Sequence, residues 1–202
     1  MKKFYFVLSF LLLFAVLAKS QPIEPGKQAP DFSLESTTGT IVSLADYADE
    51  KGVILIFSCN PCPYVKAYEQ RMIDLHHTYA PKGFPVVFIN PNDATKQPAD
   101  AMSEMQKRAA ESKYPFPYLA DAKQEVYPLY GATKTPEVFL LRNDGNGRFT
   151  VVYTGTIDDN YQDVQAVTKR YAADAVDAVL AGDLPDPAAT RAIGCGIVAK
   201  GD

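Results

Sequence analysis

The sequence predicts an α/β fold in which helices cover a mixed central sheet. Two apolar runs rich in β-branched residues, at 52–57 and 85–90, are typical of strands that are buried on both faces. Apolar residues at helical spacing separate the two runs, which indicates a parallel strand–helix–strand unit. Two further strands around a glycine-containing turn, at 137–155, add antiparallel pairing. The sheet should therefore be mixed.

The first twenty residues have the layout of a secretory signal peptide. Two lysines precede an apolar run over 4–18, and small residues at Ala18 and Ser20 precede the expected cleavage point. The alternative is a retained membrane anchor, but a membrane-spanning helix needs about 20 apolar residues. We therefore expect an exported protein, periplasmic or extracellular, with no stable membrane insertion after cleavage of residues 1–20.

Residues 21–202 are expected to form one domain that ends in a tail at 183–202, since this length can bury a sizeable core. The full chain has a net charge of −4, and removal of the signal would take away three lysines and no acid. Lysine and arginine form no cluster of the kind that follows phosphate backbones, so nucleic acid is not an expected partner. The sequence does not fix an oligomeric state.

The other elements follow in order along the chain. Alternation of apolar and polar residues predicts an N-terminal β-hairpin at 31–44, and the helix after strand 52–57 should run to about residue 80. The same criteria predict a helix at 98–112, a strand at 116–121, a short helix at 123–131 and a long amphipathic helix at 160–182. The acidic stretch before the last helix reads as a loop with Asp159 or Asn160 as the helix N-cap, rather than as a cation site.

Two of the three cysteines, Cys59 and Cys62, are separated by two residues just after strand 52–57. A disulfide across such a short loop restricts little of the unfolded chain, so reactivity explains the pair better than stability. The carboxyl ends of strands in open α/β sheets commonly hold catalytic groups, and a helix N-terminus stabilises a thiolate. We expect Cys59 to attack a disulfide and Cys62, inside the first helical turn, to resolve the product. Because Pro61 and Pro63 each remove a backbone donor, the pKa of Cys59 should be lowered less than in a fully donor-lined site.

Two alternatives remain for this pair. Cys62 could be the sole nucleophile, and Cys59 would then be buried at the strand end with no role in the reaction. The two sulfurs could instead hold a soft metal such as Cu(I). The only histidines, His76 and His77, lie about 21 Å along the following helix, beyond coordination reach.

Four stretches, "GKQAPDFSL", "CNPC", "KTPEVFLL" and "YTGTIDDN", together resemble the thioredoxin-like redoxin family of the alkyl hydroperoxide reductase/thiol-specific antioxidant superfamily. The similarity covers about residues 26–200. It implies a thioredoxin fold, a Cys59/Cys62 redox pair and a cis peptide bond before Pro136, where Thr135 and Pro136 present a backbone edge to the substrate. It also implies exchange with the thiols or disulfides of partner proteins and an upstream redox partner, without a dissociable cofactor.

Two departures from this resemblance bear on the activity. Peroxiredoxins have a threonine three residues before the peroxidatic cysteine. This chain has Ile56 at that position before Cys59. Thioredoxins carry a strand acid shortly before the cysteine pair, and "GVILIFS" has none. Glu137 is the nearest candidate acid, with an ordinary charge at a strand edge as the alternative.

The third cysteine, Cys195, is flanked by Gly194 and Gly196. We expect it to be a small buried apolar residue, and the alternative is a third redox partner or an intermolecular disulfide. Tyr64, beside the pair, could shape a substrate surface or simply pack.

The sequence therefore predicts an exported thioredoxin-like thiol–disulfide oxidoreductase that works through Cys59 and Cys62. The first alternative is a thiol peroxidase, in which Cys59 is oxidised to sulfenic acid and Cys62 closes the disulfide. The second is a non-enzymatic copper- or partner-binding module on the same fold.

Overall fold

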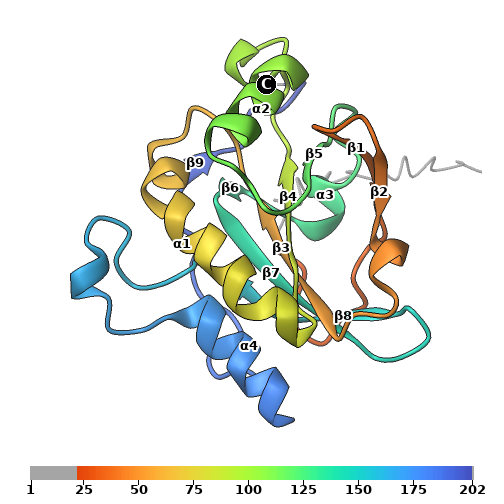
Figure 1. The fold of residues 1–202 in the computed structure, drawn as a ribbon, viewed down its shortest axis with the longest axis vertical. Helices are drawn as coiled ribbons and strands as arrows, with labels where there is room; N and C mark the ends of the chain where they lie inside the picture. The colour runs from red at the N-terminus through yellow and green to blue at the C-terminus, as the bar shows by residue number, and fades with distance from the viewer. Residues whose placement is uncertain (1–21, 202) are drawn as a thin grey trace, which may run out of the picture.

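A seven-stranded mixed sheet forms the centre of the protein, for which a computed structural model describes residues 22–201 (Figure 1). The predicted signal peptide lies outside the described residues. The strand order is β2-β1-β5-β4-β3-β7-β8, in which β3–β4 and β4–β5 are parallel and the other pairs are antiparallel. The strands are β1 (Ser33–Ser36), β2 (Ile41–Ser43), β3 (Gly52–Phe57), β4 (Val86–Asn90), β5 (Tyr118–Ala120), β7 (Glu137–Asn143) and β8 (Phe149–Gly155). The predicted mixed sheet and N-terminal hairpin are confirmed.

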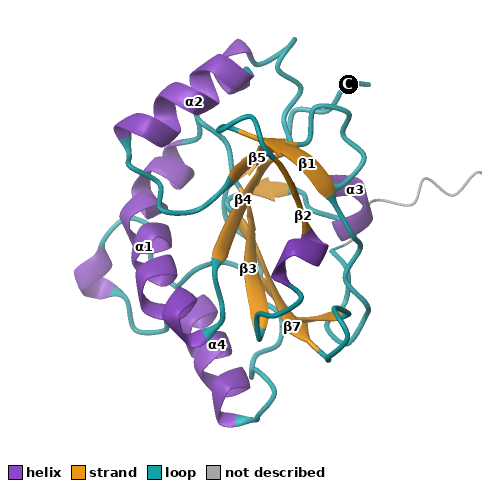
Figure 2. Cartoon of the chain, turned by 45° about the vertical axis from the view of Figure 1, so that its right-hand side comes forward, coloured by secondary structure: helices purple, strands orange, loops and turns teal. Residues whose placement is uncertain are grey.

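Helices cover both faces of this sheet (Figure 2). Helices α1 (Pro63–Tyr79), α2 (Met102–Glu111) and α4 (Tyr171–Ala181) lie on one side, and α3 (Tyr127–Tyr130) lies on the other. Within the described part of the chain, short 3-10 turns also lie at Leu44–Tyr47, Ala80–Lys82, Pro98–Asp100 and Val164–Ala166. No helix within residues 22–201 combines the length and the apolar character that crossing a membrane requires.

The central strand β3 is buried along its whole length, which explains its unbroken apolar sequence. Its side chains point alternately to the two faces of the sheet. Ile54 and Ile56 belong to the core under α1, whereas the odd-numbered residues belong to a second core beside Tyr130 of α3. Burial on both faces fixes the register of β3, and with it the place where the chain leaves the sheet.

The C-terminal tail forms a second, two-stranded sheet that the sequence did not predict. Strand β9 (Cys195–Gly196) pairs antiparallel with β6 (Lys134–Thr135), and Cys195 lies opposite Thr135. Figure 1 shows β9 beside β6, at the end of the main sheet where α1 begins. The tail therefore returns to the region of the cysteine pair.

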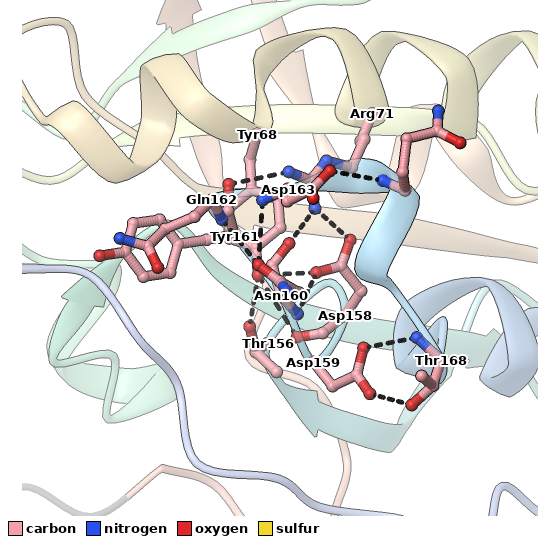
Figure 3. A network of polar contacts seen from close by, with 11 residues as sticks. Tyr68, Arg71, Thr156, Asp158, Asp159, Asn160, Tyr161, Gln162, Asp163 and Thr168 are labelled. Atoms are coloured by element: carbon pink, nitrogen blue, oxygen red, sulfur yellow. Dashed lines mark hydrogen bonds and ion pairs between the residues drawn. The ribbon is translucent and has the colours of Figure 1, made fainter.

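The predicted helix over 160–182 is wrong in its first half, because α4 begins only at Tyr171. Acidic and amide side chains in the preceding segment bond their own main chain instead of continuing a helix (Figure 3). Asn160 accepts from the N–H groups of Gln162 and Asp163 at 3.1 and 3.0 Å. These contacts fold the segment into a loop, and Arg170, whose side chain makes no capping bond, takes the N-cap position.

This loop is held against α1 by one arginine. Arg71 donates to Asp158 at 2.5 Å and to the carbonyl oxygens of Asn160 and Tyr161 at 2.7 and 2.8 Å (Figure 3). The side chain of Asp158 is 4% exposed and that of Arg71 is 16% exposed. The carboxylate of Asp158 thus depends on Arg71 for its charge partner.

Replacing Arg71 by methionine should lower the free energy of unfolding by about 3 kcal/mol, because a nearly buried carboxylate loses its ion pair. Arg170→Met is the matched control. Arg170 pairs with Asp174 while 66% of its side chain is exposed, so its loss should cost below about 0.5 kcal/mol. Urea denaturation of both variants measures the difference, and equal losses would contradict this account of the loop.

Candidate active site

Cys59 lies in the loop that joins β3 to α1, two residues after the strand ends. The Ser58 N–H donates to the Ile89 carbonyl at 2.9 Å, which continues the pairing with β4 up to the cysteine. Helix α1 begins at Pro63, and Cys62 is its N-cap residue. Cys62 therefore precedes the first turn rather than lying inside it, because Pro63 occupies the first helical position.

Thr135 brings the two predicted cysteines together. Its hydroxyl oxygen lies 3.0 Å from Cys59 Sγ, and its carbonyl oxygen lies 3.1 Å from Cys62 Sγ. Thr135 is fully buried, and its peptide bond to Pro136 is cis. All four residues that the sequence singled out thus lie in one cluster at the carboxyl end of β3.

A disulfide joins Cys62 to Cys195, with a Cα–Cα distance of 6.0 Å, and Cys59 is the free thiol. The expectation that Cys195 is an unbonded buried apolar residue is therefore wrong. Cys195 is half-buried in β9, where its pairing with Thr135 brings its sulfur to the N-cap of α1. The alternative, in which Cys195 has a redox partner, agrees with this arrangement.

The pKa of Cys59 is raised to about 11, mainly by burial of the side chain. Hydrogen bonds from the Thr135 hydroxyl, the Cys62 N–H and the Asn92 side chain lower the pKa, whereas the charge of Asp100 raises it. The predicted lowering of this pKa is wrong for the described conformation, because loss of water around the sulfur outweighs its three donors.

Asp100 is a buried acid of this site that sequence analysis missed. One carboxylate oxygen accepts from the Asn60 N–H at 2.7 Å and from Asn90 Nδ2 at 2.8 Å, and the other accepts from Asn92 Nδ2 at 2.8 Å. A signal was present, because Asn90 ends the predicted strand 85–90 and Asn92 follows it, at the same sheet edge as Cys59. Asp100 itself carried none, since it was assigned to a helix over 98–112 that here begins with a separate 3-10 turn.

The remaining candidates have structural contacts. Glu137 accepts from the N–H groups of Thr133 and Lys134 at 2.7 and 3.0 Å and so fixes the loop before Thr135. Tyr64 packs against Tyr161 in the loop before α4, with ring centroids 4.5 Å apart. Within residues 22–201, histidine, cysteine and acidic side chains form no group of three that could hold a metal ion.

Comparison with known proteins identifies the family. The model of the AhpC/TSA family matches residues 25–153. The chain belongs to this family. A crystal structure of an uncharacterized conserved protein from Geobacillus kaustophilus is 37% identical, with a TM-score of 0.81, and the match covers 88% of this chain and 93% of that one.

Two of the similar proteins come from Bacillus subtilis. The thiol-disulfide oxidoreductase ResA is 28% identical over 156 residues, which cover 76% of this chain and 80% of ResA. The thioredoxin-like protein YneN is 34% identical over 141 residues, which cover 69% of this chain and 76% of YneN. The predicted thioredoxin-like fold and family are confirmed.

The Cys59 thiol should titrate near pH 11 in protein that carries the Cys62–Cys195 disulfide. Asp100→Asn should lower this pKa, since it removes a nearby negative charge, and Thr135→Val should raise it, since it removes a donor. The ¹³Cβ shift of labelled cysteine measures both effects. Glu104→Gln, which removes an exposed carboxylate on α2, serves as the charge control. A wild-type midpoint at or below 9, or shifts opposite in sign to these, would contradict the account.

Proposed function

We propose that this protein exchanges disulfides with partner proteins through Cys59 and Cys62, with Cys59 attacking and Cys62 resolving. The observation that carries the proposal is the contact of both sulfurs with Thr135, at the end of the central strand. Two sulfurs that share one neighbour can meet with little movement of the backbone. The name of the relative ResA, a thiol-disulfide oxidoreductase, supports the same reaction class.

The reaction conserves electrons between the two proteins. The Cys59 thiolate attacks one sulfur of a partner disulfide, and the other partner sulfur leaves as a thiolate. The Cys62 thiolate then attacks Cys59 Sγ, which forms the Cys59–Cys62 bond and releases the second partner thiolate. Two electrons pass from the dithiol to the partner, and the reverse sequence oxidises a partner. An upstream redox protein returns the pair to its starting state.

Thr135 and Pro136 supply the proposed substrate edge. The main chain of Thr135 lies at the cysteines and pairs with β9 in the structure, and an extended partner segment would pair with the same edge. Main-chain pairing holds a partner without reading its sequence, so the partner class is protein thiols and disulfides rather than one small molecule.

Export is part of the proposal and depends on the sequence of residues 1–20. We further propose that residues 21–202 act as one redox domain with the tail 183–202 attached. An oxidising compartment outside the cytosol is where disulfides persist, which agrees with three cysteines used in redox chemistry.

A glutathione redox series measures the proposed activity directly. In Cys195→Ser protein, where Cys62 has no competing partner, Cys59 and Cys62 should interconvert between dithiol and disulfide in one reversible two-electron transition, followed by alkylation and mass spectrometry. A midpoint near roughly −270 mV would make the protein a reductant of its partners, and one near roughly −120 mV an oxidant.

Substitutions test which residues carry the exchange. Cys59→Ser and Cys62→Ser should each slow reduction of a disulfide-bonded reporter protein by at least about 1,000-fold, since each removes a reacting sulfur. His77→Ala, at an exposed position of α1, should keep the wild-type rate. Full exchange activity in Cys59→Ser would refute the proposal.

Peroxide turnover that depends on Cys59 would favour the alternative thiol peroxidase. Copper that co-purifies with the protein and is lost in Cys59→Ser would favour the alternative copper-binding module.

A further inference from the structure

The C-terminal tail is anchored to the body of the protein on both sides of Cys195. Before Cys195, the Thr190 N–H donates to the carbonyl of Thr154 on β8 at 2.9 Å. After it, the Val198 N–H donates to Asn92 Oδ1 at 2.8 Å, beside the cysteine site. The tail therefore crosses the carboxyl end of the main sheet with Cys195 at the middle of its path.

Between these anchors the tail fills the strand edge at Thr135. Cys195 lies opposite Thr135, and Gly196 lies opposite Lys134, in an antiparallel pair. An unpaired strand edge offers its N–H and carbonyl groups to any extended segment, and here the segment is the protein's own. Beneath it, Cys59 is 3% exposed and Cys62 is 2% exposed. A partner protein cannot reach the edge or the sulfurs while the tail is in place.

We propose that residues 191–199 form an internal substrate strand, which pairs with Thr135 where an extended partner segment would pair and presents Cys195 to Cys62 for disulfide exchange. The inference deepens the proposed function and rests on it. It makes Cys195 the third redox residue of the chain, and it makes the tail a competitor of partner proteins for the same edge.

The exchange step needs no outside oxidant or reductant. The Cys59 thiolate attacks Cys62 Sγ, the Cys59–Cys62 bond forms, and the Cys62–Cys195 bond breaks. Cys195 leaves as a thiolate and takes up a proton equivalent to the one that Cys59 lost. One disulfide and one thiol exist before and after, so the two forms are isomers in equilibrium. In the reverse step Cys195 removes the disulfide from the buried pair after a partner has been reduced.

The surroundings of the disulfide favour exchange over a purely structural staple. A free thiol lies next to it, because Cys59 Sγ accepts a hydrogen bond from the Cys62 N–H and shares Thr135 with Cys62. The two sulfurs of the disulfide also differ in access, since Cys195 is half-buried and Cys62 is almost completely buried. An outside thiol would therefore meet the bond at Cys195, and the inner thiol would meet it at Cys62.

The two glycines of the tail provide a matched pair of variants. A Cβ at Gly194 would lie 2.2 Å from the Thr135 carbonyl oxygen and 2.7 Å from its carbonyl carbon, so Gly194→Ala must push the tail off the edge. A Cβ at Gly196 would have no heavy atom within 4 Å. Gly196→Ala therefore makes the same chemical change two residues away and leaves the pairing in place.

The experiment identifies the one free cysteine in singly oxidised protein. Purified protein is oxidised with glutathione, quenched in acid, alkylated and mapped by mass spectrometry. A free Cys59 reports the Cys62–Cys195 isomer, and a free Cys195 reports the Cys59–Cys62 isomer.

Wild type and Gly196→Ala should show mostly the Cys62–Cys195 isomer with a measurable share of the Cys59–Cys62 isomer. Gly194→Ala should shift the ratio toward the second by about fivefold to thirtyfold. Thr190→Val removes the hydroxyl that contacts the Tyr153 hydroxyl at 2.7 Å and accepts from the Thr156 N–H at 3.0 Å, so it loosens the distant anchor and should shift the ratio in the same direction.

Cys195→Ser separates the failure of this inference from the failure of the proposed function. One outcome would overturn the internal substrate strand alone. Wild type, Gly194→Ala and Thr190→Val would all show only the Cys62–Cys195 isomer, while Cys195→Ser would form the Cys59–Cys62 disulfide. The Cys62–Cys195 bond would then be purely structural. A free Cys195 in every wild-type sample would overturn it as well. A Cys195→Ser protein that never forms the Cys59–Cys62 disulfide would overturn the proposed function, and the inference with it.

Discussion

The site depends on one buried residue, Thr135, which contacts or pairs with all three cysteines. Its hydroxyl contacts Cys59, its carbonyl contacts Cys62, and its main chain pairs with Cys195. Glu137 holds the loop in front of it through two main-chain N–H groups, and the central strand β3 fixes Phe57 opposite Glu137 in the sheet. Because the buried sheet sets this register, the sulfurs of Cys59 and Cys62 converge with that of Cys195, which lies 133 residues after Cys62.

The conformation with the tail in place disfavours the reactive form of Cys59. A pKa of about 11 leaves about one thiol in ten thousand ionised at neutral pH. Burial is the main cause, and the negative charge of the Asp100 carboxylate, which three amide N–H donors hold in place, acts in the same direction. The raised pKa is therefore that of a resting form, in which the Cys62–Cys195 disulfide is closed and Cys59 is rarely ionised.

The sequence predicted the elements that hydrophobic periodicity controls. The strands β3 and β4 and the helix after Cys62 were placed to within a residue or two, because burial dictates their composition. The predicted helix was wrong over 160–170, because Asn160 and its neighbours form hydrogen bonds between their side chains and the nearby main chain. The partner of Cys195 lies 133 residues away, and no local pattern encodes a pairing at that separation. Asp100 is close in sequence to Asn90 and Asn92, but its assignment to a regular helix over 98–112 concealed that it turns toward them.

Asn92 connects the position of the tail to the chemistry of Cys59. Its side-chain nitrogen Nδ2 donates to Asp100, and its side chain also forms a hydrogen bond to the Cys59 sulfur. Its side-chain oxygen Oδ1 accepts from the Val198 N–H of the tail. In reduced protein, where no disulfide holds Cys195, departure of the tail gives this side-chain oxygen to water, and the amide nitrogen can still face the Cys59 sulfur. Water also reaches Cys59, which removes the main cause of its raised pKa. Uncovering the strand edge at Thr135 and ionising Cys59 are thus favoured by the same movement, so the site becomes reactive when it becomes accessible to a partner.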